Sequence, residues 1–244
     1  MKVTFLGSGD AFGSGGRFQT CILVETFSDK FLLDCGCSSM IAMRKTGVDP
    51  NEIAAIFLTH LHGDHFGGVP FFLLDAQMIS KRTSPLIIAG PVGTKERIIC
   101  AMEVMFPGSS KVQQKFNWDI VEIDTGAAQS FAGVDITTYP MVHPSGNTST
   151  ALRIQCGGKT IAYTGDTEWN GAIIDAAQNA DLLIAEAYFF EKKVKFHLDY
   201  KTIMEHLPEL GVKKVVLTHM GNDMLGRLTE VECEIANDGK VLEI

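Results

Sequence analysis

The 244-residue sequence has no long apolar run, no excess of positive charge and no low-complexity tract. No apolar run approaches the roughly 18 residues that a membrane-crossing helix needs, so we expect no association with a membrane. The first residues carry one lysine and a short apolar run before glycines follow, which is too short for the core of a signal peptide. A cytoplasmic protein is therefore expected.

The charge balance is acidic, with 21 Lys and Arg against 29 Asp and Glu and a net charge of −8. Such a chain as a whole is a poor match for a polyanion such as tRNA, although a local patch can override this argument. The one dense basic cluster consists of Lys192, Lys193 and Lys195, and we interpret it as a solvated loop. An RNA substrate is therefore possible but not favoured.

No linker or internal repeat divides the sequence, so we expect a single domain over residues 1–244. The six cysteines are scattered through apolar stretches, which is typical of reduced core thiols (Cys21, Cys35, Cys37, Cys100, Cys156 and Cys233). Cys35 and Cys37 form the one close pair. A structural zinc site would need a second cysteine pair or a nearby histidine, and neither is present beside them.

Short β-branched segments alternate with longer helical ones along the chain. Strands are expected at 2–7, 20–26, 30–36, 53–60, 85–91, 119–123, 134–143, 150–156, 159–167, 181–189 and 213–220. Helices are expected at 38–47, 67–80, 93–106 and 199–210. Residues 231–244 place an Asn-Asp-Gly turn between alternating segments and predict a terminal hairpin. Strands followed by helices, repeated twice, favour two packed sheets with helices outside.

Histidine is scarce, with seven in the chain, and three of the seven lie in one short stretch. The segment THLHGDH places His60, His62, Asp64 and His65 within six positions. Three further residues of ligand type follow predicted strands (His143, Asp166 and His219). Because ligands at strand ends can meet at one rim of a sheet sandwich, these seven residues predict a common site.

The donor set points to two divalent metal ions. Imidazoles and carboxylates without thiolate suit zinc, manganese or iron. Seven donors exceed the four that one tetrahedral zinc site needs. Two metals that share a bridging carboxylate account for all seven, and we expect zinc or manganese.

The stretch THLHGDHFGG resembles the HxHxDH signature of the metallo-β-lactamase superfamily. The opening FLGSGDAFGSGGRFQT and the LLDCG segment look more like the tRNase Z and cyclic phosphodiesterase branch than the lactamase branch. The resemblance covers essentially the whole chain and implies an α/β fold, a four-layer αββα sandwich with the metals in a cleft at one edge. It also implies that one metal is held by His60, His62 and His143 and the other by Asp64, His65 and His219, with Asp166 bridging.

Two such ions, ~3.5–4 Å apart, can lower the pKa of a bridging water and stabilise the attacking and leaving oxygens. We therefore expect hydroxide as the nucleophile, phosphodiesters as substrates, and Asp64 among the catalytic residues. His197 is the candidate acid for the leaving oxygen, with Glu186 holding its imidazole. This pair resembles the tRNase Z branch, although the leading His of the family's HEAT-like stretch is Ala185 here. Asp34 is expected to orient a ligand imidazole.

The expected substrate is a small phosphodiester, such as a cyclic phosphate or cyclic nucleotide. True tRNase Z enzymes carry a tRNA-gripping arm between the positions of His143 and Asp166, and here only 22 residues separate them. Phosphonate-pathway cyclic phosphodiesterases have an extra zinc site built from cysteines near the N-terminus. This site is expected to be absent here, because that region contains only Cys21.

Alternatives are a tRNA 3′-processing endoribonuclease, a lactone or thioester hydrolase, an iron-dependent oxygenase of sulfur compounds, and a non-catalytic binding module. A homodimer is expected because relatives often dimerise.

Overall fold

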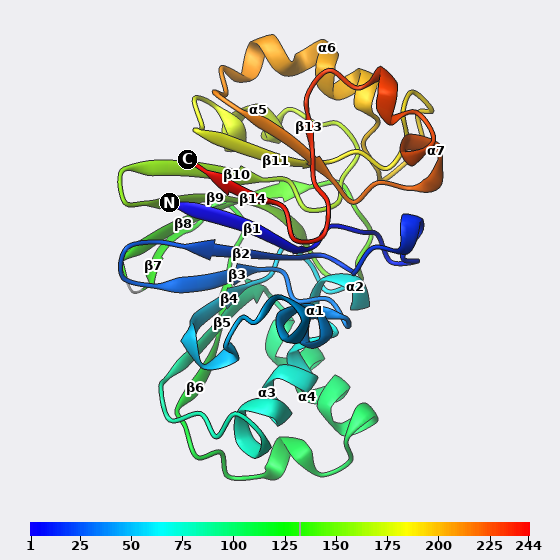
Figure 1. The fold of residues 1–244 in the computed structure, drawn as a ribbon. Coiled ribbons are helices and arrows are strands. Elements are labelled where there is room, and N and C mark those ends of the chain that lie inside the picture. The colour runs from blue at the N-terminus through cyan, green and yellow to red at the C-terminus, as the bar shows by residue number, and fades with distance from the viewer. Residues whose placement is uncertain (132) are drawn as a thin grey trace.

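Two mixed β-sheets lie face to face between two layers of helices in the computed structural model, which describes residues 1–131 and 133–244 (Figure 1). One sheet has the strand order β14-β1-β2-β3-β4-β5-β6, and the other has the order β13-β12-β11-β10-β9-β8-β7. This architecture is the predicted four-layer αββα sandwich.

The first sheet contains most strands of the N-terminal half. Its strands are β1 (Lys2–Gly7), β2 (Cys21–Glu25), β3 (Lys30–Leu33), β4 (Ile53–Phe57), β5 (Leu86–Pro91), β6 (Trp118–Ile123) and β14 (Val241–Glu243). β1, β2 and β3 pair antiparallel, whereas β3 to β6 run parallel, each new strand following a helical connection. The carboxyl end of the buried strand β4 therefore lies at the edge where the histidine-rich stretch begins.

The second sheet has the same size. Its strands are β7 (Ala128–Phe131), β8 (Val134–Met141), β9 (Ser149–Cys156), β10 (Lys159–Tyr163), β11 (Leu182–Glu186), β12 (Val215–Thr218) and β13 (Glu234–Ile235). β9 is antiparallel to both neighbours, and β10 to β13 run parallel. β8 therefore points in the same direction as β10 and β12, so the three carboxyl ends share one edge.

The helices cover the outer face of each sheet (Figure 1). Against the first sheet lie α1 (Ser39–Thr46), α3 (Val69–Met78) and α4 (Thr94–Met105), and against the second lie α5 (Ala172–Ala177) and α6 (Tyr200–Leu210). Two single-turn helices follow strands at the site edge, α2 (Gly63–Phe66) and α7 (Asn222–Leu225). The 3-10 turns are η1 (Ser14–Gly16), η2 (Pro50–Glu52), η3 (Ser109–Lys111) and η4 (Leu228–Glu230).

The core lies in three layers, one between the sheets and one under each helical layer. Between the sheets, Phe5, Phe31 and Phe57 of the first sheet face Ile136 and Ile184 of the second, and all five are buried. The rings of Phe31 and Phe57 meet edge to face, with centroids 5.3 Å apart. This apolar packing holds the two sheets at a fixed spacing, which is needed if residues from both are to form one site.

The predicted terminal hairpin at 231–244 is wrong. β13 pairs parallel with β12 in the second sheet, whereas β14 pairs antiparallel with β1 in the first. The turn between them is held by Asp238, whose carboxylate accepts hydrogen bonds from the backbone N–H groups of Ser8 and Phe18. The alternating pattern was therefore that of two edge strands, each completing a different sheet.

Two further features differ from, or add to, the expectations. Cys37 and Cys100 are exposed, so the cysteines are not all core thiols, although all six are free. Within the described part of the chain, no helix is long and apolar enough to span a bilayer.

Candidate metal centre and catalytic site

The predicted donors lie where strands end on one edge of the sandwich. His60 follows β4, and His62 directly precedes the single turn α2, which carries Asp64 and His65. In the second sheet, the three remaining donors follow the carboxyl ends of β8, β10 and β12 (His143, Asp166 and His219). Each sheet therefore supplies part of one cluster.

Left-handed backbone conformations direct two of these side chains. Gly165 has a φ of +58°, and a Cβ at this position would lie 2.8 Å from the Cβ of Thr59. Only glycine satisfies both conditions, and it turns the chain so that Asp166 faces inward. His219 has a φ of +54°, and its N–H donates to the carbonyl of Ser8 at 3.1 Å. A non-glycine residue in this region is uncommon and often marks a functional position.

Three imidazoles form the first group. One ligand-type atom from each of His60, His62 and His143 lies within 4.8 Å of the others. The Nε2 atom of His143 lies 3.0 Å from the Nδ1 atom of His62. Two ring nitrogens this close are arranged to share one proton or one cation.

The second group contains two carboxylates and two imidazoles, all buried. The Asp64 carboxylate lies 3.2 Å from Nε2 of both His65 and His219. Asp166 lies 3.3 Å from His65 and 3.4 Å from His219, and its Oδ2 atom is also 3.9 Å from Nε2 of His60. Asp166 therefore approaches donors of both groups.

The cluster fits bound metal. Among the described residues, the buried Nε2 of His60 and Oδ1 of Asp166 have no hydrogen-bond partner. An unpaired buried polar atom is costly, and both atoms face the other donors of the cluster. The donor set of imidazole and carboxylate, with no thiolate, suits divalent cations such as zinc or manganese.

The charges of the protein groups favour the same conclusion. Burial lowers the pKa of His60 well below its usual range, and the neighbouring His65 acts in the same direction, so His60 is a neutral donor. Burial also opposes a charge on His219, but Asp166 and Asp64 outweigh it and raise its pKa to about 9. The pKa of His65 is also raised well above its usual value, because the charges of Asp166 and Asp64 outweigh burial. A cation would take the place of these protons between the carboxylates.

Asp34 connects several members of the site. Its carboxylate accepts hydrogen bonds from Nδ1 of His65 at 2.7 Å, the hydroxyl of Tyr163 at 2.8 Å and the backbone N–H of Thr59 at 2.8 Å. The hydroxyl of Thr59 in turn lies 3.0 Å from Nδ1 of His60. The Nε2 atoms of both imidazoles are thereby directed into the cluster, as predicted for Asp34.

The predicted acid and its partner are in contact. Nδ1 of His197 lies 2.8 Å from Oε2 of Glu186, the last residue of β11. Burial, together with the charge of Asp166, raises the pKa of Glu186 to about 7. Burial opposes a proton on His197, but the hydrogen bond to Glu186 outweighs it and raises the pKa of His197. His197 is partly exposed and also approaches Asp166 and His143, so it borders the cluster on its open side.

A protein-family model described as "Anti-Pycsar protein Apyc1" matches residues 1–241. The chain belongs to this family. The match covers both sheets and every donor described above, so the site of this Apyc1-family chain lies inside the shared region.

Similar proteins include ribonucleases and other proteins of the same fold. Ribonuclease Z of Methanosarcina acetivorans is 24% identical over 296 aligned residues, which cover 100% of this chain and 94% of that protein. Human tRNase Z, short form, matches with a TM-score of 0.82 and 25% identity, covering 100% of this chain and 99% of the other. The metallo-beta-lactamase fold protein YhfI from Bacillus subtilis has a TM-score of 0.81 and 24% identity, with 100% and 98% covered.

These likenesses confirm the metallo-β-lactamase fold and its tRNase Z-like branch. The Apyc1-family chain is a metal-dependent hydrolase, and its His and Asp cluster fits divalent cations. The structure brings all seven predicted donors and the Glu186–His197 pair together, while their individual roles stay predictions. The roles of Thr59 and Tyr163 were not predicted from the sequence, where a hydroxyl within an otherwise apolar segment was the available signal.

Proposed function

We propose that the seven donors hold two divalent cations, zinc or manganese, and that the site hydrolyses phosphodiesters. The first cation is assigned to His60, His62 and His143, the second to Asp64, His65 and His219, with Asp166 between them. When bound, two cations would supply an activated water and would offset the charge that develops on the attacking and leaving oxygens. The unpaired buried Nε2 of His60 supports the assignment.

His197 is proposed as the acid that protonates the leaving oxygen. Glu186 binds its Nδ1 atom, which leaves Nε2 directed away from Glu186 and free to donate. The raised pKa of His197 keeps the imidazole protonated closer to neutral pH, as an acid requires. Asp64 contributes to catalysis as a metal ligand in this proposal.

The proposed substrate is a small phosphodiester, such as a cyclic phosphate or cyclic nucleotide. The observation that carries this choice is the short connection between His143 and Asp166. It holds a short loop, β9, a Gly157-Gly158 turn and β10, and the two strands pair directly. The alignment with the archaeal Ribonuclease Z spans 296 positions, whereas this chain has 244 residues, so at least 52 aligned positions have no counterpart here.

Processing of tRNA 3′ ends is the second candidate. The names of the curated relatives and of the human structure support it better than they support a small substrate. In this chain, the exposed residues Lys192, Lys193 and Lys195 lie in the loop that carries His197 and offer a basic surface there. The net charge of −8 weighs against a wide RNA-binding face.

One panel of substrates separates these candidates. Protein of measured zinc, manganese and iron content is assayed with 2′,3′-cyclic and 3′,5′-cyclic nucleotides, bis(p-nitrophenyl) phosphate and a precursor tRNA with a 3′ trailer. We expect turnover of a cyclic or small diester and loss of bound metal and turnover in Asp166→Ala. Cleavage of the precursor alone would favour the second candidate. One bound iron and no diester turnover would overturn both and favour an oxygenase.

A further inference from the structure

The loop between β11 and α6 carries His197, and its backbone is fixed at the preceding residue. Phe196 has a φ of +74°, an uncommon conformation for a residue with a side chain. Its carbonyl accepts a hydrogen bond from Nδ1 of His143 at 2.9 Å. Its N–H donates to the Glu168 carboxylate at 2.8 Å. Both polar groups of this one residue are therefore held by side chains from outside the loop.

Glu168 is itself held close to the metal cluster. It follows the bridging Asp166 by two positions, and its N–H donates to the carbonyl of Val142 at 3.2 Å. The N–H of Val142 donates to the hydroxyl of Thr167 at 3.0 Å. Glu168 therefore joins the ends of β8 and β10 to the loop that carries His197.

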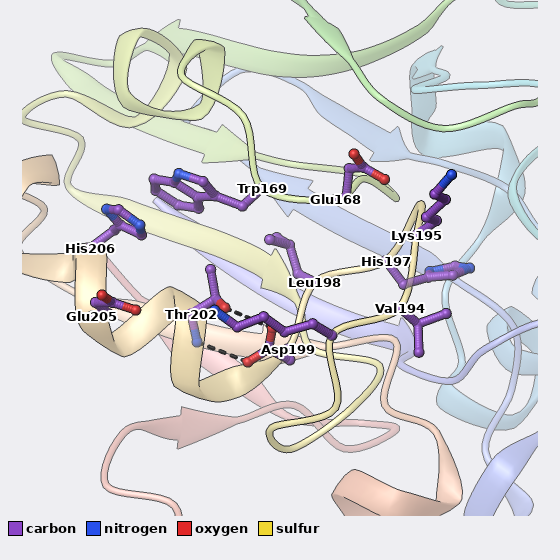
Figure 2. A pocket seen from close by; sticks show the side chains of 11 residues that line it. Glu168, Trp169, Val194, Lys195, His197, Leu198, Asp199, Thr202, Glu205 and His206 are labelled. Carbon is purple, nitrogen blue, oxygen red and sulfur yellow. Dashed lines mark hydrogen bonds between the residues drawn. The ribbon is translucent and has the colours of Figure 1, made fainter.

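Figure 2 shows Glu168 beside the end of the loop that carries Lys195 and His197. These residues line a cavity of about 420 Å³, whose other end is formed by Trp169, Glu205 and His206. Among the described residues, Glu205 makes no side-chain hydrogen bond. Glu205 is therefore a matched glutamate in the same cavity that makes no side-chain hydrogen bond to the described residues of the loop.

We propose that Glu168 is a positioning residue for catalysis. Its carboxylate keeps the backbone of Phe196 left-handed, and this backbone turn aims the imidazole of His197 at Glu186 and at the leaving oxygen. The hydrogen-bond partner of Glu168 is a backbone N–H, so in this proposal Glu168 acts through His197 and not on the reacting atoms. This inference rests on the proposed function of His197 as the acid.

Four proteins test the proposal, the unsubstituted chain, Glu168→Ala, Glu168→Gln and Glu205→Ala, each with its metal content measured. The substrates are bis(p-nitrophenyl) phosphate, whose leaving group departs without a proton, and diphenyl phosphate, whose phenolate is more basic. We expect Glu168→Ala to lower kcat for diphenyl phosphate by about tenfold or more, with a much smaller loss for the nitrophenyl ester. KM and metal content are expected to stay unchanged. Glu168→Gln keeps an acceptor oxygen and should restore most of kcat, and Glu205→Ala should behave as the unsubstituted protein.

A second measurement does not depend on turnover. In protein labelled with 15N-histidine, the Nδ1 proton of His197, bonded to Glu186, is expected to give a resonance that Glu168→Ala loses and Glu168→Gln keeps. An unchanged resonance in Glu168→Ala, equal losses on both esters, or a Gln variant as impaired as the Ala variant would overturn the proposal. If the metal-loaded unsubstituted protein hydrolyses neither these two esters nor the cyclic nucleotides of the substrate panel, the proposed function is wrong, and the resonance alone decides whether Glu168 positions His197.

Discussion

Asp34 is a buried carboxylate that meets three different parts of the chain. It accepts hydrogen bonds from Thr59, which follows β4, from His65 in α2 and from Tyr163 at the end of β10. A buried carboxylate is tolerated only when its oxygens are well satisfied. Each donor to Asp34 therefore contributes both to stability and to the direction of the imidazoles.

The Tyr163 hydroxyl is the donor that can be removed with the least change of shape. Tyr163→Phe should lower the free energy of unfolding by about 1–3 kcal/mol, because a hydrogen bond to a buried charged group is lost. Tyr139→Phe is the control, since within the described part of the chain the Tyr139 hydroxyl makes no hydrogen bond. Urea unfolding of both variants measures the difference, and equal stabilities would show that the Tyr163 hydroxyl does not support Asp34.

Glu186 sets the protonation of His197, so its removal should change the pH dependence of hydrolysis. An acid must be protonated to act, and the hydrogen bond to Glu186 raises the pKa of His197. In Glu186→Gln that pKa falls, so kcat for diphenyl phosphate should decline at a lower pH than in the unsubstituted protein. Above neutral pH we expect a loss of about tenfold or more. A pH profile of kcat checks this, and an alkaline limb in the same place would contradict the role of Glu186.

At the scale of elements, local patterns predicted most strands and the longer helices. β1 to β6 and β8 to β12 lie within predicted segments to within two residues, because period-2 apolar patterns and Gly or Asp turns are local signals. The tail was different, since its two strands pair with β12 and β1, which lie far away in the sequence. The local sequence of an edge strand does not indicate which sheet the strand joins.

In the candidate site, too, local features of the sequence were predictable and long-range contacts were not. The seven donors were predictable because each is a ligand type that follows a strand or lies within the THLHGDH stretch. The roles of Thr59, Tyr163 and Glu168 were not predictable, because their partners are distant in the sequence: Thr59 and Tyr163 donate to Asp34, and Glu168 accepts from Phe196. Donor identity is a local property, whereas the hydrogen bonds that orient a donor depend on the whole fold.

The end of β10 gives an element-scale prediction. Gly165→Ala places a side chain at a φ of +58° and 2.8 Å from Thr59, so either Asp166 or Thr59 must move. We expect a loss of about 1–3 kcal/mol of stability from backbone strain and a clear loss of bound metal. Gly158→Ala is the control, because it has a φ of +72° but nothing within 4 Å. Equal metal content in both variants would show that the close approach to Thr59 is unimportant.

At the scale of the whole molecule, the cluster joins the two sheets. His60, His62, Asp64 and His65 come from the connection after β4 in the first sheet, and the other three donors come from the second. A cation bound between them should stabilise the folded chain by about 4 kcal/mol at a concentration of about 1,000 Kd. Chelation with EDTA should therefore lower Tm, and addition of zinc or manganese should restore it.

The chelated protein should also show a pH dependence that the metal-loaded protein lacks. Asp166 and Asp64 raise the pKa of His219 to about 9 from an ordinary 6.5, so the protonated form favours the folded state. This stabilisation is fully present below pH 6.5 and is lost as the pH rises through about 9. Tm in EDTA should therefore fall over that interval, and His219→Gln should flatten the fall. A bound cation takes the place of the proton, so the Tm of the metal-loaded protein should not show this fall. A Tm in EDTA that is flat or rises over this interval would show that these carboxylates do not hold a proton on His219.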